Sequence, residues 1–287
     1  MKICWFGNNQ LGIVEGDIVL DVSAALKVLP APVYPATAKG DPLIANLARV
    51  QEEIRKLAPS AKKTPVKDAK FLSPVAAPSK IIGVPVNYIK HVEEAAAQTD
   101  VFPLRHQQGT VTDQGFFLKS NSSLVGPSEG VKLRFTDRRN DHEMELGVII
   151  GKHANNVAEE NALDYVAGYC IALDMVVRGP EDRSFRKSID TYSVAGPWMV
   201  TKDEIPDPGH LKFSLAVNGV EKQASNTQFL ILNIQKQIAF ASKWYALHPG
   251  DIIMTGTCEG VSPVVPGDVM HCEIEKIGAM DVKVEAA

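Results

Sequence analysis

The stretch RRNDHEMELGVIIGK, residues 138–152, strongly constrains how this chain can fold. Its acidic residues Asp141, Glu143 and Glu145 stand at every second position, and the segment then becomes fully apolar at 148–150. Because side chains alternate across a strand, Glu143 and Glu145 project from one face with their bases about 7 Å apart. Two carboxylates held that close repel each other. Either water screens them on the polar face of a sheet, or a cation lies between them.

A third carboxylate ends another apolar run. Asp174 is the last residue of GYCIALD, where an unpaired buried charge is costly. It can pair with Arg178, four residues on, or share a cation with Glu143 and Glu145. Three carboxylates without Cys or His suit the hard cations Mg(II), Mn(II) or Ca(II) and disfavour zinc. The residues alone leave both alternatives open.

Composition narrows the protein class. At 287 residues with 45% hydrophobic content, the chain has enough apolar residues to form the core of one large domain and a smaller appended domain. No apolar run approaches the ~20 residues of a membrane helix, and the start lacks the core of a signal peptide, so we expect a cytoplasmic protein without membrane contact. The net charge is −4, and neither acidic nor basic residues cluster strongly along the sequence, which argues against a nucleic-acid-binding surface. The cysteines lack C-x-x-C spacing, which argues against a zinc ribbon or a disulfide framework; they are Cys4, Cys170, Cys258 and Cys272.

The first part of the chain reads as short strands and one helix. Residues 2–22 are β-rich and contain a turn, which is typical of a meander. From Asp41 to Leu57, apolar residues recur at helical spacing. Asp41 is the expected cap, Pro42 lies in the first turn, and Pro59 ends the helix.

The segment APSAKKTPVKDAK buries little, so we place a domain boundary near Lys70. We expect a small N-terminal domain over residues 1–70 and a larger domain over 71–287. The larger domain consists mostly of β-branched or alternating segments separated by Gly, Pro and Asn turns. Two helices are expected within it, over 158–168 and 233–247.

An ordered series of motifs resembles a known family. DHEMELGVIIG (141–151), DYVAGYCIALDMVVRGPEDRSFRKSIDTYSVAGPW (164–198) and HPGDIIMTGTCEGVSPVVPGD (248–268) are similar to the fumarylacetoacetate hydrolase (FAH) family, in particular its bacterial members acting on 2-oxo acids. The resemblance runs from Lys80 to the C-terminus. It implies an α+β, mostly β fold, in which a large mixed β-sandwich roll follows a small α/β N-terminal domain, and a homodimeric assembly.

The resemblance also implies a metal site and a lid. The family holds a divalent metal with E-x-E and a later Asp, which fall on Glu143, Glu145 and Asp174. In VNYIKHVEEA, His91 and Glu94 are three residues apart and share a helix face. The family pair activates water, so the resemblance makes His91 the general base and Glu94 the group that orients it. Taken alone, such a pair is more often an ordinary surface pair.

Further residues are matched to the substrate. Lys187 in FRKSID corresponds to a lysine that faces the substrate, although alone it reads as a solvated member of a charge cluster. Gly256 and Thr257 in TGT match residues that bind the substrate carboxylate through a hydroxyl and backbone N–H groups. Without the resemblance, TGT is a tight turn.

Several positions depart from the family pattern or extend it. Arg178 and Glu181 are expected to contact substrate, and Glu181 stands where many relatives have glutamine. Cys258 replaces a frequent proline, and we interpret its thiol as incidental. The loop over 97–115 is long. Its Arg105 and His106 either contact the far end of a polar or dianionic substrate or belong to a mobile surface loop.

The expected activity follows from the resemblance. It is that of a divalent-metal-dependent hydrolase, which cleaves a carbon–carbon bond in 2,4-dioxo acids of the acylpyruvate or diketo-deoxy sugar acid type through a metal-bound enolate. The partner is then a small-molecule 2-oxo acid. Oxaloacetate decarboxylase and hydroxymuconate-type isomerase are alternatives on the same site. A noncatalytic protein braced by its metal is an alternative of another class.

Overall fold

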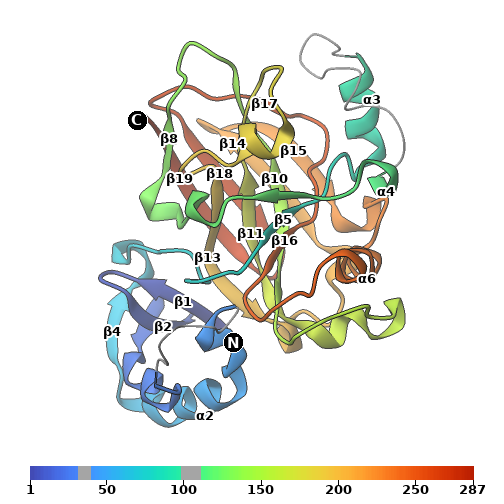
Figure 1. Cartoon of the computed structure of the whole chain (residues 1–287). Coiled ribbons are helices and arrows are strands. Elements are labelled where there is room, and N and C mark those ends of the chain that lie inside the picture. The colour runs from blue at the N-terminus through green and yellow to red at the C-terminus, as the bar shows by residue number, and fades with distance from the viewer. Residues whose placement is uncertain (32–39, 98–110) are drawn as a thin grey trace.

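The computed structural model describes residues 1–31, 40–97 and 111–287. Over these residues the fold is α+β and mostly β, as expected, and the strands form three sheets. The largest sheet runs β4-β3-β2-β1-β13-β11-β10-β16-β5-β6, with β7 beside β13 (Figure 1). Its strands are β1 (Lys2–Phe6), β2 (Gln10–Glu15), β3 (Ile18–Asp21), β4 (Lys62–Pro65), β5 (Ile81–Gly83), β6 (Phe117–Lys119), β7 (Leu124–Val125), β10 (Met144–Ile150), β11 (Val166–Asp174), β13 (Ser193–Thr201) and β16 (Ile252–Met254).

Two smaller sheets complete the roll. One runs β15-β14-β18-β19-β8 and the other β12-β9-β17. Their strands are β8 (Val131–Leu133), β9 (Asn140–His142), β12 (Val176–Val177), β14 (Lys212–Val217), β15 (Val220–Asn226), β17 (Ser262–Pro263), β18 (Val269–Ile274) and β19 (Gly278–Ala286). The helices are α1 (Pro42–Ala45), α2 (Leu47–Leu57), α3 (Ile89–Ala97), α4 (Val111–Gln114), α5 (Arg183–Lys187) and α6 (Ile234–Trp244).

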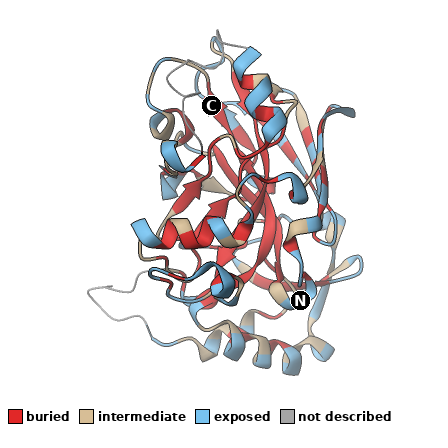
Figure 2. Cartoon of the chain, turned by 90° about the vertical axis from the view of Figure 1, so that its right-hand side faces the viewer, coloured by how far each residue is buried: buried red, intermediate tan, exposed pale blue. Residues whose placement is uncertain are grey.

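The central strands are covered on both faces, which explains their continuous apolar runs. One core cluster joins Val148 and Ile171 of the large sheet to side chains of β14, β18 and β19 such as Leu215. A second cluster joins Ile149 of β10 to side chains of α1, α2, β1 and β2, such as Ile54. Figure 2 shows the resulting buried interior strands, with exposed residues on the surrounding helices and loops.

The N-terminal elements are continuous with the large sheet. β1 pairs antiparallel with β13, so that Lys2 lies opposite Val200 and Ile3 opposite Met199. The meander expected over residues 2–22 is present as β1, β2 and β3. β4 then extends the same sheet beyond β3.

Three expected helices differ in detail. The helix from Asp41 to Leu57 is two helices, because Asn46 leaves helical geometry between α1 and α2. Asp41 does cap α1, and its Oδ1 accepts from the N–H groups of Leu43 and Ile44 at 2.9 and 3.2 Å.

The other two helices are shorter than the sequence suggested. The segment expected to be helical over 158–168 is a 3-10 helix, Glu159–Tyr165, whose successor Val166 already begins β11. The last expected helix ends as α6 at Trp244, because Tyr245 is extended. No helix in the described parts of the chain is long and apolar enough to cross a membrane.

Candidate active site

Adjacent antiparallel strands bring the three acidic residues together. Glu145 lies on β10 opposite Ala172 of β11, and Asp174 is the last residue of β11. The N–H of Asp174 donates to the carbonyl of Glu143 at 2.9 Å, which fixes the two strand ends side by side. The carboxylate oxygens of Glu143, Glu145 and Asp174 lie within 4.8 Å of one another, and all three residues are buried.

Buried cations partly balance these carboxylates. Lys187 Nζ lies 2.7 Å from both Glu143 Oε2 and Asp174 Oδ2. Lys119, from β6, donates to the other oxygen of Asp174 and to the carbonyl of Tyr192. Lys187 is only 4% exposed, so the reading of a solvated surface lysine is wrong.

Arg178 does not form the ion pair with Asp174 that the sequence offered as one alternative. Its Nε lies 2.7 Å from Asp141 Oδ2, and its Nη2 lies 3.1 Å from Glu143 Oε1. The ion pairs of Asp174 are instead with the two lysines. Arg178 therefore supports the outer edge of the cluster, beside Glu143.

The charge balance shows why a cation fits here. Burial raises the pKa of Glu145 well above its usual value, and the neighbouring Asp174 raises it further. Burial acts in the same direction on Glu143, but Lys187 and Arg178 outweigh it and lower that pKa. Glu145 is thus the carboxylate whose negative charge is least compensated. An all-oxygen cluster in which one carboxylate makes no ion pair among the described residues is a suitable donor set for a hard divalent cation.

His91 and Glu94 form a pair on α3, in which His91 is buried and Glu94 is partly exposed. His91 Nδ1 lies 3.0 Å from Glu94 Oε2, and Glu94 Oε1 accepts from the N–H of Gly260 at 3.0 Å. His91 is 4% exposed, so the alternative of an ordinary surface pair is wrong. With Nδ1–H donated to the carboxylate, the basic lone pair of the imidazole is on Nε2.

Gly256 and Thr257 follow β16 and close one side of the cluster. The N–H of Gly256 donates to Glu145 Oε2 at 2.7 Å. Gly256 has φ +97°, and a Cβ there would lie 2.6 Å from that of Asn87, so the position requires glycine.

The hydroxyl of Thr257, which the resemblance assigns to substrate binding, makes two hydrogen bonds within the protein. It donates to the carbonyl of Met144 at 2.8 Å and accepts from Gln223 Nε2 at 2.7 Å. The amide orientation of Gln223 is fixed because its Oε1 accepts from the N–H of Met144. In this arrangement the hydroxyl proton of Thr257 is not offered to a ligand.

Glu181 is held by an arginine. Arg138 makes two hydrogen bonds to it, at 3.0 Å to Oε1 and 2.8 Å to Oε2. These bonds lower the pKa of Glu181. The extra negative charge at this position is therefore compensated within the protein.

Two other expectations concern Cys258 and the long loop. Cys258 is buried, and burial raises the pKa of its thiol to about 12, so it is a poor nucleophile. This agrees with an incidental role. Arg105 and His106 lie outside the described residues.

Lys119 and Gln223 belong to the site but were missed from the sequence. Lys119 stands in GFFLKS with no charged neighbour to single it out, and Gln223 stands in the polar strand VEKQASN. The one sequence feature that could have indicated Lys119 is its position directly after an apolar run. Gln223 gave none.

The family model described as fumarylacetoacetate (FAA) hydrolase C-terminal matches residues 80–285. The chain belongs to the fumarylacetoacetate hydrolase family. Its sequence is 51% identical to a maleylpyruvate hydrolase of Aquipseudomonas alcaligenes over 100% of both chains. It is 34% identical to a mitochondrial oxaloacetate tautomerase of Rattus norvegicus, over 94% of this chain and 84% of that one.

A solved structure shares the whole fold. The maleylpyruvate hydrolase from Sphingobium sp. SYK-6, crystallised with manganese(II) ion and pyruvate, is 38% identical to this chain with a TM-score of 0.84, and 100% of both chains is covered. The fold of this chain is therefore similar to that of the solved relative, and it is mostly β with several sheets.

Proposed function

We propose that this protein is a metal-dependent hydrolase of acylpyruvates, with maleylpyruvate as the first substrate to test. The observation that carries the proposal is the buried cluster in which Lys187 contacts two of three converging carboxylates. Full-length similarity to maleylpyruvate hydrolases supports the choice of substrate.

Glu143, Glu145 and Asp174 would hold Mg(II) or Mn(II). Manganese in the solved relative supports this assignment. When bound, such a cation supplies Lewis-acid stabilisation of negative charge on the oxygens of a 2-oxo acid.

The chain's own residues would then divide the remaining work. His91 Nε2 accepts a proton from water, while Glu94 holds the ring through Nδ1. The water oxygen attacks the C4 carbonyl of the 2,4-dioxo acid, and the C3–C4 bond breaks with its electron pair going to C3. Lys187 delivers a proton to C3. The products are a carboxylic acid and pyruvate, which balances the addition of one water.

The remaining predicted residues would form the walls of this site. Arg178, beside Glu143, is placed to attract the anionic substrate, and Gly256 orients Glu145 through its N–H. Thr257 and Glu181 would act indirectly, by holding other residues of the site in position. Thr257 braces the strand at Met144, and Glu181 holds Arg138.

The test is a steady-state assay after EDTA treatment, with Mg(II) or Mn(II) restored, on maleylpyruvate, acetylpyruvate, a 2,4-dioxo-3-deoxy sugar acid, oxaloacetate and a hydroxymuconate-like diacid. Metal-dependent release of pyruvate from an acylpyruvate is the expected result. Turnover of oxaloacetate or of the muconate alone would replace hydrolysis with decarboxylation or isomerisation. Mn(II) binding without any turnover would favour the noncatalytic alternative.

Organisation beyond the site is also proposed. We infer a small domain over residues 1–70, a catalytic domain over 71–287, a homodimer, and a cytoplasmic location. The domain division is supported by the family match, which begins at residue 80. The cytoplasm is supported by four free, buried cysteines. Sedimentation velocity and cell fractionation test the assembly and the location.

A further inference from the structure

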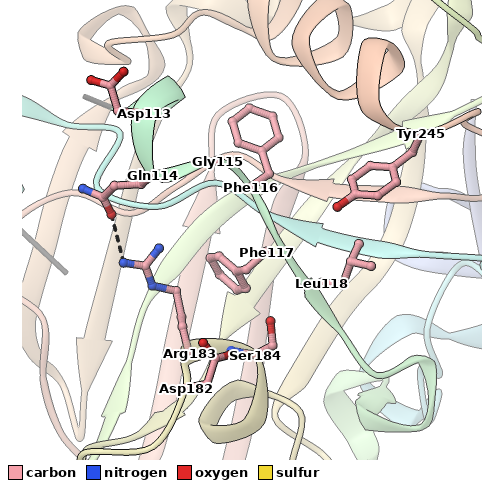
Figure 3. Close-up of a pocket in the computed structure, with 10 residues that line it drawn as sticks. All are labelled: Asp113, Gln114, Gly115, Phe116, Phe117, Leu118, Asp182, Arg183, Ser184 and Tyr245. Atoms are coloured by element: carbon pink, nitrogen blue, oxygen red, sulfur yellow. Dashed lines mark hydrogen bonds between the residues drawn. The ribbon is translucent and has the colours of Figure 1, made fainter. Parts of the chain in front are cut away.

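A cavity of about 640 Å³ lies between α4, β6 and α5 (Figure 3). We call it the Arg183 pocket. Its lining includes Gln114, Phe116, Phe117, Arg183 and Tyr245, together with two acidic residues, Asp113 and Asp182. The carboxylate of Asp182 accepts from the N–H of Ser184 and caps α5, whereas Arg183 is the cation of the lining. Aromatic walls beside a guanidinium and an amide suit a flat organic anion.

Arg183 is a half-buried cation without an acidic partner in the described chain. Its Nη2 donates to Gln114 Oε1 at 3.0 Å, and its guanidinium carbon lies 5.5 Å from the centroid of the Phe117 ring. None of the ion pairs among the described residues includes it. Since burying a charge without a counter-charge is costly, an anion is the missing partner.

Arg183 is coupled to the site by its helix. It stands four residues before Lys187 on α5, so the two side chains share one helix face with Cβ atoms about 5–6 Å apart. Lys187 Nζ lies 5.4 Å from the centroid of the same Phe117 ring. The ring of Phe117 thus lies near both Lys187, at the carboxylate cluster, and Arg183, in the pocket.

Electrostatics point to the same neighbourhood. Burial lowers the pKa of Arg183, and the carboxylates of Glu143 and Asp174 oppose that shift. The guanidinium is therefore close enough to the cluster to interact with it.

We propose that Arg183, supported by Gln114, binds the second carboxylate of a dianionic 2,4-dioxo acid. This inference rests on the proposed function and deepens it. The conjugated chain of such a diacid is flat and fits along the Phe117 ring, from Lys187 at C3 to Arg183 at the distal carboxylate. The enzyme then prefers dicarboxylic acylpyruvates to monocarboxylic ones.

The experiment compares kcat/KM on maleylpyruvate and on acetylpyruvate, which has a methyl group in place of the acidic chain. Arg183→Gln removes the charge. It should lower kcat/KM on maleylpyruvate about 10- to 100-fold, as expected for a lost hydrogen-bonded charge, while acetylpyruvate changes by less than about threefold. Arg183→Lys should recover part of the loss, since it restores the charge without the planar fork.

Gln114→Glu provides a second, independent change. It places a carboxylate beside the guanidinium, where it competes with the distal carboxylate, so the same selective loss is expected. Arg49→Gln is the matched control, because Arg49 is exposed on α2 and its loss changes the net charge equally. That variant should behave as wild type on both substrates.

The outcomes separate this inference from the proposed function. Equal losses on both substrates in Arg183→Gln would mean that Arg183 supports the whole site, and the carboxylate subsite would be wrong. A wild-type enzyme that turns over acetylpyruvate as well as maleylpyruvate would also overturn the subsite while leaving the hydrolase intact. Turnover of neither substrate with Mn(II) would overturn the hydrolase itself and this inference with it.

Discussion

At the residue scale, Glu143 and Asp174 each contact two cationic side chains. Both oxygens of Glu143 are hydrogen-bonded, one to Arg178 and one to Lys187. Both oxygens of Asp174 are hydrogen-bonded as well, one to Lys119 and one to Lys187. A divalent cation held by these carboxylates would compete with Lys187 for their oxygens.

His91→Ala tests the division of labour within the site. Loss of the proposed base should lower kcat on maleylpyruvate about 10²- to 10⁴-fold, while Mn(II) binding measured by calorimetry stays unchanged, because the three carboxylates remain. The matched control is His210→Ala, since His210 makes the same kind of pair with Asp207 but is exposed. Intact hydrolysis together with weakened Mn(II) binding would show that His91 serves the metal instead.

The cluster of Glu143, Glu145 and Asp174 could be predicted because each acid interrupts or ends an apolar strand, where its charge needs a partner. Lys119 and Gln223 could not. Lys119 meets Asp174 across 55 residues, and Gln223 meets Met144 across 79. Such contacts depend on which strands become neighbours, and no local spacing encodes that.

At the scale of elements, caps and turn residues were readable, but helix continuity was not. Asp41 was recognisable as a cap, since Asp followed by Pro is a common start. The break at Asn46 was hidden because the apolar spacing continues through it from Ile44 to Leu47. Likewise, 159–165 carries a helical composition, yet it forms a 3-10 helix, and strand β11 begins at Val166.

Asp41→Ala should destabilise the protein by about 2–4 kcal/mol, measured by urea unfolding. Besides capping α1, Asp41 accepts through Oδ2 from the N–H groups of Ala76 and Ala77, at 2.9 and 3.0 Å. The substitution therefore leaves several buried donors without a partner. Asp207→Ala removes an exposed cap and should cost less than about 1 kcal/mol. A similar small effect at Asp41 would mean that water replaces its carboxylate.

At the scale of the whole molecule, the overall fold class was predictable from the number and alternation of strands, with the family resemblance supplying the roll. The order of strands in the sheets was not. β5 lies between β16 and β6, and β1 lies beside β13, so the large sheet is built from segments far apart in the sequence. Side-chain alternation fixes which face of a strand is buried, but it does not identify the neighbouring strand.

Mn(II) should raise the melting temperature of the EDTA-treated protein by several degrees. A ligand that binds only the folded state, at a hundred times its Kd, adds about 2.7 kcal/mol to the stability. Glu145→Gln should remove most of this increment, since a neutral amide is a weaker ligand for a hard cation than a carboxylate. Glu273→Gln, on the exposed face of β18, is the control and should retain it. An increment of equal size in both variants would place the ion elsewhere.

The pairing of β1 with β13 affects the order of folding during synthesis on the ribosome. Lys2 is translated well before its partner Val200. Until Val200 is made, one edge of β1 has no neighbour, and long-range pairing of this kind forms slowly. The nascent chain thus completes the pairing of β1 late, and the segment from β1 to β3 joins the large sheet only when the central strands have been made.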